Sequence, residues 1–237
     1  MKIQSFGDTH IGRVRSSNQD AIIAEEALGL FGVADGIGGL PDGAFASSRA
    51  LDLIRHNCEV NASGEASDLA WVVRAANRQL YEEGRHRHPA TGVGTTLTLA
   101  SLSEEQMIIA HAGDSCAMLL RGTDFRRLTR EHTVAAEIQG RPVAVPDESL
   151  HERSFHTLTR CLGESEEVDL DLLKVQIRTG DRFLFATDGL TKVCQRLELQ
   201  AHLTDALSAR DAVIRLMRAV LARGAPDNVG LVAVFVS

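Results

Sequence analysis

The sequence predicts an α+β fold in which stacked β-sheets are covered by helices. Segments of strand type cluster at the start, in the middle and at the end of the 237-residue chain. Helical segments come in blocks between these clusters, which argues against the regular strand–helix alternation that builds a parallel sheet. No proline- or serine-rich linker divides the chain, so we expect one domain over residues 1–237.

The expected strands are short apolar or alternating runs. Residues 172–178 alternate apolar and polar side chains, whereas residues 229–236 are mostly apolar and predict a strand buried on both faces. The runs 107–112 and 116–121 predict the two arms of a hairpin around Gly113-Asp114-Ser115. The other expected strands are residues 2–6, 21–24, 30–34, 94–99 and 182–187.

Three segments have the spacing of amphipathic helices. In residues 68–83 an apolar stripe occupies one face, with Arg74, Asn77 and Arg78 off it, and residues 44–59 form another such helix. A third helix begins at Ser208, since Asp211 three residues later resembles a capping box. We interpret these stripes as core packing against a sheet and not as binding surfaces.

Regular patterning is lost between Arg130 and His156, where polar residues, glycine and prolines replace it. Long segments without a sustained period are uncommon inside compact domains and tend to be functional loops. We therefore expect a flap at about residues 133–157.

Composition and charge argue against several classes of protein. The formal net charge is −7 and the lysines and arginines are scattered, so neither nucleic acid nor an anionic membrane surface is expected as a partner. No apolar run approaches the length of a membrane span and no secretion signal stands at the N-terminus, which predicts a cytoplasmic protein. The four cysteines form no Cys-x-x-Cys pair, so neither a zinc site nor a disulfide framework is predicted.

Acidic residues stand at the ends of several apolar runs. Asp35 follows one run and precedes a glycine-rich turn that starts at Gly36; Asp114 and Asp188 follow two others, and Asp227 precedes the last. Carboxylates and main-chain carbonyls are the ligands that Mg²⁺, Mn²⁺ and Ca²⁺ prefer. A pair of divalent cations about 3.5 to 4 Å apart also needs several anionic ligands. The pattern therefore predicts a composite metal site.

Several common catalytic motifs are absent from the sequence. Gly36 and Gly38 begin a Gly-x-Gly, but Pro41 breaks the dinucleotide-binding fingerprint there, and no phosphate-binding loop with Gly-Lys-Ser/Thr occurs. The serine-hydrolase elbow and the His-Glu-x-x-His zinc helix are missing too.

Eight short motifs occur in a fixed order along nearly the whole chain. They are Arg15-Ser16-Ser17-Asn18-Gln19-Asp20, Val33-Ala34-Asp35-Gly36-Ile37-Gly38-Gly39, Gly94-Thr95-Thr96, Gly113-Asp114-Ser115, Leu128-Thr129-Arg130-Glu131-His132, Leu158-Thr159-Arg160-Cys161-Leu162-Gly163, Thr187-Asp188-Gly189-Leu190 and Pro226-Asp227-Asn228. In this order they resemble the motifs of the metal-dependent protein phosphatases of type 2C, in the compact form of the bacterial branch. The resemblance implies a four-layer α-β-β-α sandwich of two antiparallel sheets flanked by helices.

The resemblance also implies a centre of two Mn²⁺ or Mg²⁺ ions. Matched residue by residue, Asp35 would bridge the two ions and Gly36 would offer its carbonyl oxygen. Asp188 and Asp227 would complete the shell of the first ion, and Asp20 would sit at the second ion through water.

Three further residues match positions with known roles in the family. Asp114 matches an aspartate that helps to hold a weaker third ion, and Arg15 matches the arginine that grips the substrate phosphate. Asn228 would orient Asp227 or a metal-bound water. Arg15, Asp20 and Asp35 are thus the expected catalytic residues.

The activity that the resemblance implies is hydrolysis of phosphoserine and phosphothreonine in proteins by a metal-activated water, opposing a serine/threonine kinase, by a monomeric enzyme. One alternative is a catalytically silent regulatory module of the same fold. The retained aspartates argue against it, because a crowd of repelling carboxylates is costly without a function. Another alternative, a calcium-stabilised structural protein, is weakened by the absence of EF-hand spacing.

The sequence departs from the family pattern in places. Ile37 and Leu40 stand where some relatives carry histidines, so the general acid that protonates the leaving group is unassigned, with His132 and His156 of the flap as candidates. Gly230 stands where threonine is common, which puts the packing around the metal ligands in question.

Overall fold

The computed structural model describes residues 1–60, 68–103, 105–139 and 157–237. Within these ranges, ten strands form two antiparallel sheets of five strands each. Sheet A has the spatial order β1 (Ile3–His10), β10 (Val229–Val236), β9 (Arg182–Ala186), β6 (Cys116–Arg121) and β7 (Asp124–Arg127). Sheet B has the order β2 (Asp20–Glu25), β3 (Leu30–Asp35), β4 (Leu97–Ser103), β5 (Gln106–Ala112) and β8 (Asp171–Gln176).

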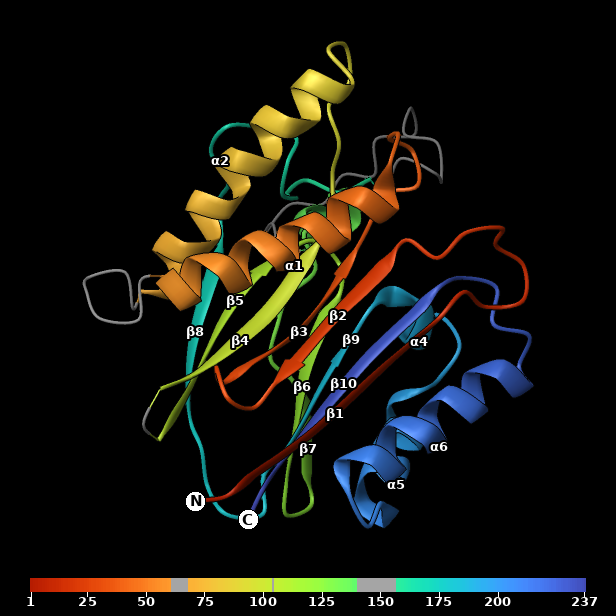
Figure 1. Cartoon of the computed structure of the whole chain (residues 1–237). Helices are drawn as coiled ribbons and strands as arrows, with labels where there is room; N and C mark the ends of the chain where they lie inside the picture. The colour runs from red at the N-terminus through yellow and green to blue at the C-terminus, as the bar shows by residue number, and fades with distance from the viewer. Residues whose placement is uncertain (61–67, 104, 140–156) are drawn as a thin grey trace.

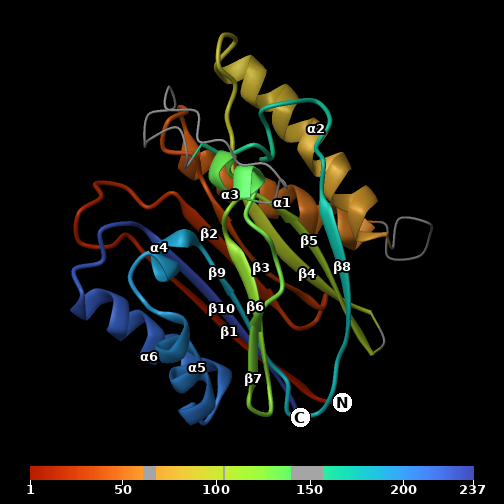
Figure 2. The same ribbon diagram turned by 180° about the vertical axis from the view of Figure 1, so that it is seen from behind.

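Helices cover the outer face of each sheet, which makes four layers (Figure 1). The helices α1 (Gly43–Val60) and α2 (Leu69–Arg87) lie on sheet B, and α5 (Arg196–Asp205) and α6 (Ala209–Ala222) lie on sheet A. Figure 2 shows the same layers from behind, with the short α3 (Val134–Gln139) and α4 (Asp188–Thr191). The predicted α-β-β-α sandwich is confirmed.

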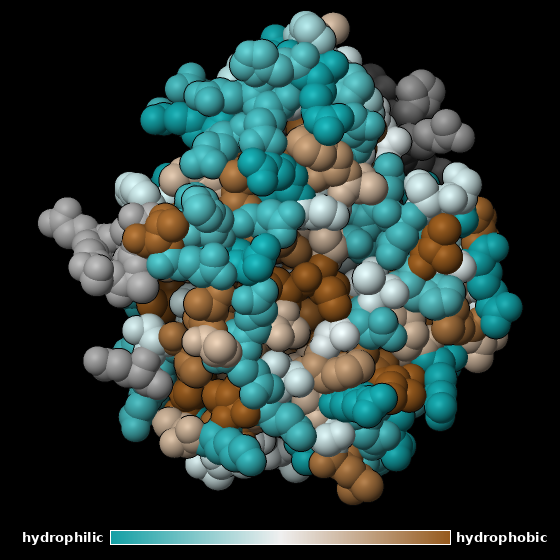
Figure 3. Space-filling model, in the orientation of Figure 1, coloured by the Kyte–Doolittle hydropathy of each residue, from teal (hydrophilic) through white to brown (hydrophobic). Residues whose placement is uncertain are grey.

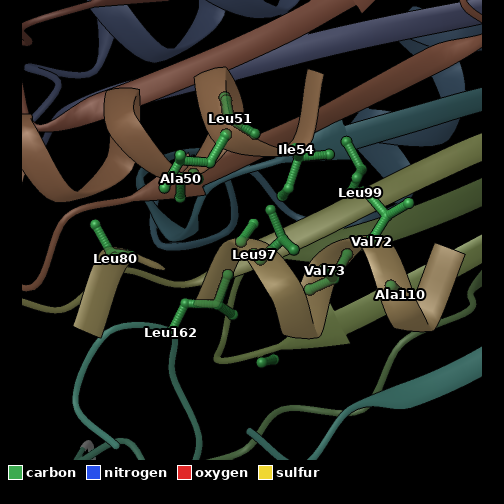
Figure 4. Packing of buried hydrophobic residues seen from close by; sticks show 14 of the residues in the cluster. Ala50, Leu51, Ile54, Val72, Val73, Leu80, Leu97, Leu99, Ala110 and Leu162 are labelled. Atoms are coloured by element: carbon green, nitrogen blue, oxygen red, sulfur yellow. The ribbon is translucent and has the colours of Figure 1, made fainter. Parts of the chain in front are cut away.

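The buried apolar side chains fill the three spaces between these layers. Ile54 of α1, Val73 of α2 and Leu99 of β4 belong to the cluster between the helices and sheet B (Figure 4). Phe31 and Phe185 belong to a second cluster between the two sheets, and a third lies between sheet A and helices α5 and α6. On the face drawn in Figure 3, hydrophilic side chains gather over α2, and hydrophobic ones surface in separate groups nearer the sheets.

The strand patterns explain which faces are covered. Along β10, Val232 and Val234 enter the cluster between the sheets, while Leu231 and Ala233 enter the cluster under α5 and α6. The prediction of a strand buried on both faces is therefore confirmed. The alternation predicted for residues 172–178 also appears in β8, whose side chains are half-buried and exposed in turn.

The three predicted helices are present as α1, α2 and α6. Ser208 caps α6, since its hydroxyl accepts a hydrogen bond from the Asp211 backbone N–H at 3.1 Å, and Asp211 Oδ2 accepts one from the Leu207 N–H at 3.0 Å. The placement of Asn77 off the buried face of α2 is wrong, because this residue is fully buried. Its side-chain amide makes hydrogen bonds that connect α2 to the loop before β8.

The predicted hairpin of residues 107–121 is wrong as well. β5 pairs with β4 and β8 in sheet B, whereas β6 pairs with β9 and β7 in sheet A, so the chain crosses between the sheets at residues 113–115. β6 carries apolar side chains on both faces, and a central position in sheet A covers both. Gly113 makes the crossing with a φ of 114°, where a Cβ would lie 2.6 Å from Thr96 Cγ2.

Four elements have no counterpart among the expected ones. β7 is four residues long and three of them are charged, and α4 is a single turn. α5 has only two buried residues and therefore a weak apolar stripe. α3 lies within the predicted flap of about residues 133–157, of which residues 140–156 fall outside the described residues.

The two chain ends lie side by side because β1 and β10 are paired, with Ile3 opposite Val236. They are far from α4, which lies toward the other end of the sheets (Figure 1). In the described part of the chain, none of the helices combines the length and the apolar character needed to cross a membrane.

Candidate metal and phosphate site

A cavity of about 200 Å³ opens at the end of the sandwich that carries α4. Seven of the eight residues predicted for the site line it, contributed by five separate segments: Arg15, Asp35, Gly36, Asp114, Asp188, Asp227 and Asn228. The eighth, Asp20, lies behind this cavity, paired with Asp35 across the β2–β3 ladder. Residues that are far apart in the sequence thus lie together at one end of the sandwich.

Asp20 is a buried carboxylate, and Asp35 on the neighbouring strand is a half-buried one. Burial raises the pKa of Asp20 to about 7, although a hydrogen bond from Thr187 Oγ1 to Asp20 Oδ2 at 2.8 Å opposes this change. The other oxygen, Asp20 Oδ1, is buried without a hydrogen-bond partner among the described residues. Burial and then the charge of Asp20 hold the pKa of Asp35 well above its usual value.

The threonine motif holds the backbone of Asp35 in place. The Asp35 N–H donates to Thr96 Oγ1 at 2.9 Å, and Thr95 Oγ1 donates to the Asp35 carbonyl oxygen at 2.9 Å. Thr96 Oγ1 also lies 2.8 Å from Ser115 Oγ, which ties the crossing between the sheets to the same strand end. The motifs around Thr96 and Ser115 therefore support the backbone of Asp35 together.

Two glycines follow aspartates because the backbone leaves no room for a side chain. A Cβ on Gly36 would lie 2.2 Å from the Gly43 carbonyl oxygen, and a Cβ on Gly189 would lie 1.9 Å from the Asn228 carbonyl oxygen. Only glycine permits these approaches. The close contact at Gly189 brings the start of α4 against the start of β10, and so brings Asp188 near Asp227.

Two cations pair with Asp188 and Asp227. Lys192 Nζ lies 2.6 Å from Asp188 Oδ2 and 2.9 Å from Asp227 Oδ2. Arg15 Nε lies 2.8 Å from Asp227 Oδ1, with its side chain half exposed at the cavity. Burial alone would raise the pKa of Asp227, but hydrogen bonds from Arg15 and Lys192 outweigh it and leave this pKa below its usual value.

The remaining acid, Asp114, follows the crossing glycine. Burial, and then the charge of Asp188, raise the pKa of Asp114 to about 6. For Asp188 itself, burial raises the pKa while Lys192 opposes the change. Asp188 Oδ1 is a second buried carboxylate oxygen without a hydrogen-bond partner in the described part of the chain.

Asn228 acts chiefly on the loop that carries Arg15. Its Nδ2 donates to the carbonyl oxygens of Ile11 and Ser17 at 2.8 and 2.9 Å, and its Oδ1 accepts from the Gln19 N–H at 2.9 Å. Asn228 also touches Asp227, but through its backbone N–H, which donates to Asp227 Oδ1 at 2.9 Å. The side chain therefore clamps residues 11–19 over the site.

Divalent cations fit this donor set. All of the candidate ligands are oxygens, and two of the carboxylate oxygens are buried without partners; among the described residues, Arg15 and Lys192 are the cations that pair with this group of five aspartates. As they lie, no three His, Cys, Asp or Glu side chains of the described residues already form a ligand set around one point. Asp188 and Asp227 pair with the two cations instead. Hard cations such as Mg²⁺ or Mn²⁺ suit such a group of oxygens.

Comparison with known proteins assigns the family. A model described as protein phosphatase 2C matches residues 6–232. The chain belongs to the protein phosphatase 2C family. It is 27% identical over 228 residues to protein phosphatase PhpP of Streptococcus pneumoniae, which covers 93% of this chain and 92% of that protein.

Solved structures of the protein phosphatase 2C type superpose over nearly the whole chain. PppA of Pseudomonas aeruginosa, described as a key regulatory component of its T6SS, has a TM-score of 0.85 and 29% identity, covering 99% of this chain and 98% of that one. The catalytic domain of the serine/threonine protein phosphatase PstP, solved with two manganese ions, has a TM-score of 0.84 and 27% identity, covering 99% of each chain. The resemblance stated from the motifs is thus confirmed.

The departures from the protein phosphatase 2C pattern have physical explanations. Ile37 and Leu40 pack over Gly94, where a Cβ would lie 2.8 Å from Ile37 Cδ1 and 2.9 Å from Leu40 Cδ1. A Cβ on Gly230 would lie 3.2 Å from Thr187 Cγ2. Thr187 occupies that space and supplies the hydroxyl that bonds Asp20, so the support of Asp20 is retained.

Of the two candidates for the general acid, the structure describes only His132, which does not line the cavity. His132 is buried, with Nε2 3.2 Å from Asp171 Oδ2 and Nδ1 accepting from the Gly113 N–H at 3.2 Å. It supports the crossing between the sheets and does not line the cavity. His156 lies outside the described residues.

Sequence reasoning missed Lys192 and Thr187 as residues of the site. Lys192 stands four residues after Asp188, which is a spacing that joins side chains on a helix, so this signal was available. Thr187 belongs to the motif around Asp188, but its role was not predictable, because its bond to Asp20 spans 167 residues.

Proposed function

We propose that this protein is a serine/threonine protein phosphatase that hydrolyses phosphoserine and phosphothreonine monoesters with Mn²⁺ or Mg²⁺ held by its aspartate cluster. The observation that carries the proposal is the cluster itself: five aspartates at one end of the sandwich, two with unpartnered buried oxygens, and a guanidinium at the cavity. The alignment of relatives named as phosphatases over nearly the whole chain supports it.

Asp35, Asp188 and Asp227, together with the carbonyl oxygen of Gly36, would hold two divalent cations, with Asp20 beside the second. Asp114 would help to hold a weaker third. When bound, such cations lower the pKa of water and neutralise negative charge on phosphoryl oxygens. The protein's own part is to hold these oxygens in place: Thr187 fixes Asp20, and Thr95 and Thr96 fix the Asp35 backbone.

Arg15 would bind the substrate phosphate. Its side chain is half exposed at the cavity, and a guanidinium donates two parallel hydrogen bonds that match phosphate as well as carboxylate geometry. In the structure that fork is turned to Asp227. Exchanging one oxyanion partner for another would let Arg15 orient the phosphoester, while Asn228 keeps its loop in position.

The proposal includes the substrate, the opposing kinase, the cellular compartment and the oligomeric state of the enzyme. A phosphoprotein is the substrate, a serine/threonine kinase supplies it, and the enzyme acts in the cytoplasm as a monomer with one catalytic domain over residues 1–237. Residues 133–157 would act as a flap beside the site.

Phosphate release from a phosphothreonine peptide and from p-nitrophenyl phosphate tests the proposal. We expect release with Mn²⁺ or Mg²⁺, none with chelator, and a fall of about 10³-fold or more in Asp35→Asn and Asp188→Asn. A folded native protein that binds Mn²⁺ but releases no phosphate would contradict the proposal and favour a silent binding module.

A further inference from the structure

A second and larger cavity lies beside the aspartate cluster. It measures about 730 Å³ and is bounded by β7 and by the segment that joins α4 to α5. Met118, Phe125 and Leu199 form apolar parts of its wall, and Lys192 lines both this cavity and the one at the aspartates. We call this cavity the basic groove, after Arg126, Arg127, Lys192 and Arg196, which also line it.

The positive charge of the basic groove is only partly offset. Arg126 Nε lies 3.9 Å from Asp124 Oδ2, and both side chains are more than half exposed, so this pair contributes little. Arg196 donates to the carbonyl oxygen of Phe125, a neutral partner, and within the described residues it makes no ion pair. Two guanidinium charges are therefore free to attract an anion, in a chain whose formal net charge is −7.

The N-terminal end of helix α5 also borders this groove. Gln195, the N-cap residue of α5, lines the groove and makes no side-chain capping hydrogen bond. The first N–H groups of a helix carry partial positive charge, which adds to that of the two arginines, and Glu198 in the first turn of α5 is paired with Arg223. Acidic partners are thus favoured over basic ones on this side of the site.

We propose that the basic groove binds the polypeptide of the phosphoprotein substrate next to its phosphorylated residue and selects acidic residues accompanied by an apolar one. The inference rests on the proposed function. The groove adjoins the aspartate cavity through Lys192, and an extended chain rises about 3.3 Å per residue, so positions a few residues from the phosphoester reach it. Its volume lies within the range of about 300 to 1,000 Å³ typical of ligand sites. The apolar wall fits a side chain, which a free anion lacks.

Phosphothreonine peptides of equal length test the selection. They carry one leucine with either glutamates or lysines, placed before the phosphothreonine in one series and after it in another. In at least one series we expect kcat/KM to favour the acidic peptide by about tenfold in the native enzyme. The preference should fall below about threefold in the double variant Arg126→Gln/Arg196→Gln and persist in Arg218→Gln, which removes an exposed charge of α6.

Two further readouts separate failure of this inference from failure of the proposed function. Turnover of p-nitrophenyl phosphate, which is too small to reach the groove, should be equal in the native enzyme, the double variant, Arg218→Gln and the single variants Arg126→Gln and Arg196→Gln. Fluorescence anisotropy of a labelled, unphosphorylated acidic peptide should show binding that the double variant weakens about tenfold. Equal kcat/KM for acidic and basic peptides, or peptide binding that the double variant leaves unchanged, overturns the inference. An inactive native enzyme contradicts the proposed function. In that case the anisotropy measurement still shows whether the basic groove binds acidic peptides.

Discussion

At the scale of single residues, Lys192 is a cation of the site that the sequence did not predict. It places an ammonium between Asp188 and Asp227, which are two of the expected metal ligands. Although burial would lower the pKa of Lys192, Asp188 raises it, so the side chain is charged. A tethered cation of this kind competes with a divalent ion for the same carboxylates.

Replacing Lys192 with methionine should therefore strengthen metal binding. We expect the dissociation constant for Mn²⁺ to fall by about 3- to 10-fold in Lys192→Met, measured by isothermal titration calorimetry of protein freed of metal by chelator. The melting temperature in chelator should fall as well, because Asp188 then loses its cation while Asp227 keeps Arg15. Lys174→Met, which removes an exposed charge of β8, is the matched control. Weaker Mn²⁺ binding by Lys192→Met would show that the lysine assists the ions.

His111 is a buried residue with a pH-dependent cost. It is fully buried between Thr98 Oγ1, 2.9 Å from Nδ1, and the Arg130 carbonyl oxygen, 2.8 Å from Nε2. Burial lowers the pKa of His111 from 6.5 to about 4. The unfolded chain therefore binds the proton first as pH falls, so the stability that this residue contributes is present above pH 6.5 and is lost toward pH 4.

The variant His111→Gln isolates this effect. The difference in unfolding free energy between the native protein and the variant should shrink by about 2 kcal/mol between about pH 7 and about pH 5, from urea titrations at each pH. Comparing the two proteins cancels the contribution of the aspartates of the site, among which Asp20 and Asp114 have raised pKa values that act in the opposite direction. A difference that stays constant with pH would contradict a buried neutral histidine.

The residues of the site were predictable to different degrees. The aspartates were found because strand ends and glycine turns mark them in the sequence, and the motifs order them. Thr187 was not found, since nothing local connects it with Asp20. His132 was offered as an acid because it stands near the flap, and only packing shows that it faces Asp171.

At the scale of elements, Asn77 shows where helical periodicity is insufficient. Its Nδ2 donates to the carbonyl oxygens of Ser165 and Glu166 at 3.0 and 2.9 Å, and its Oδ1 accepts from the Gly163 N–H at 2.8 Å. A polar residue on a helix is expected to face water, and the stripe of α2 gave no reason to expect otherwise. The loop that covers α2 supplies the hydrogen-bond partners of Asn77, and no local sequence pattern predicts this contact.

Asn77→Ala should destabilise the protein by about 2 to 4 kcal/mol, because it leaves the buried Gly163 N–H without a partner and removes two further hydrogen bonds to the loop. Urea unfolding followed by circular dichroism measures this loss. Arg78→Ala, one position along α2 with the side chain 59% exposed, should change stability by less than about 0.5 kcal/mol. Equal losses of unfolding free energy in the two variants would contradict a stabilising role for the hydrogen bonds between Asn77 and residues 163–166.

Element pairing was the least predictable level. Two apolar runs joined by three residues with a glycine indicate a hairpin locally, and β5 and β6 have this pattern. The deciding fact is tertiary: β6 pairs with β9 and β7 in the sheet opposite to that of β5, where its two faces enter the cluster between the sheets and the cluster under α5 and α6. The crossing has a functional consequence, because it carries Asp114 to the cavity.

At the scale of the whole molecule, the stacking of the two sheets assembles the site. Asp20 and Asp35 come from sheet B, while Asp188 and Asp227 flank β9 and β10 of sheet A. The number of layers and the presence of covering helices could be expected from the order of the elements together with the motifs. Which strand ends meet could not, since that depends on the order of strands within each sheet.

Mn²⁺ binding tests the central claim, that the stacked sheets bring these aspartates together as a metal centre. Isothermal titration of metal-free native protein should show about two Mn²⁺ ions per chain. Asp35→Asn should weaken binding by about 100-fold or more while keeping the native circular dichroism spectrum. Binding of Mn²⁺ by Asp35→Asn that equals that of the native chain, or no binding by the folded native chain, would contradict the account.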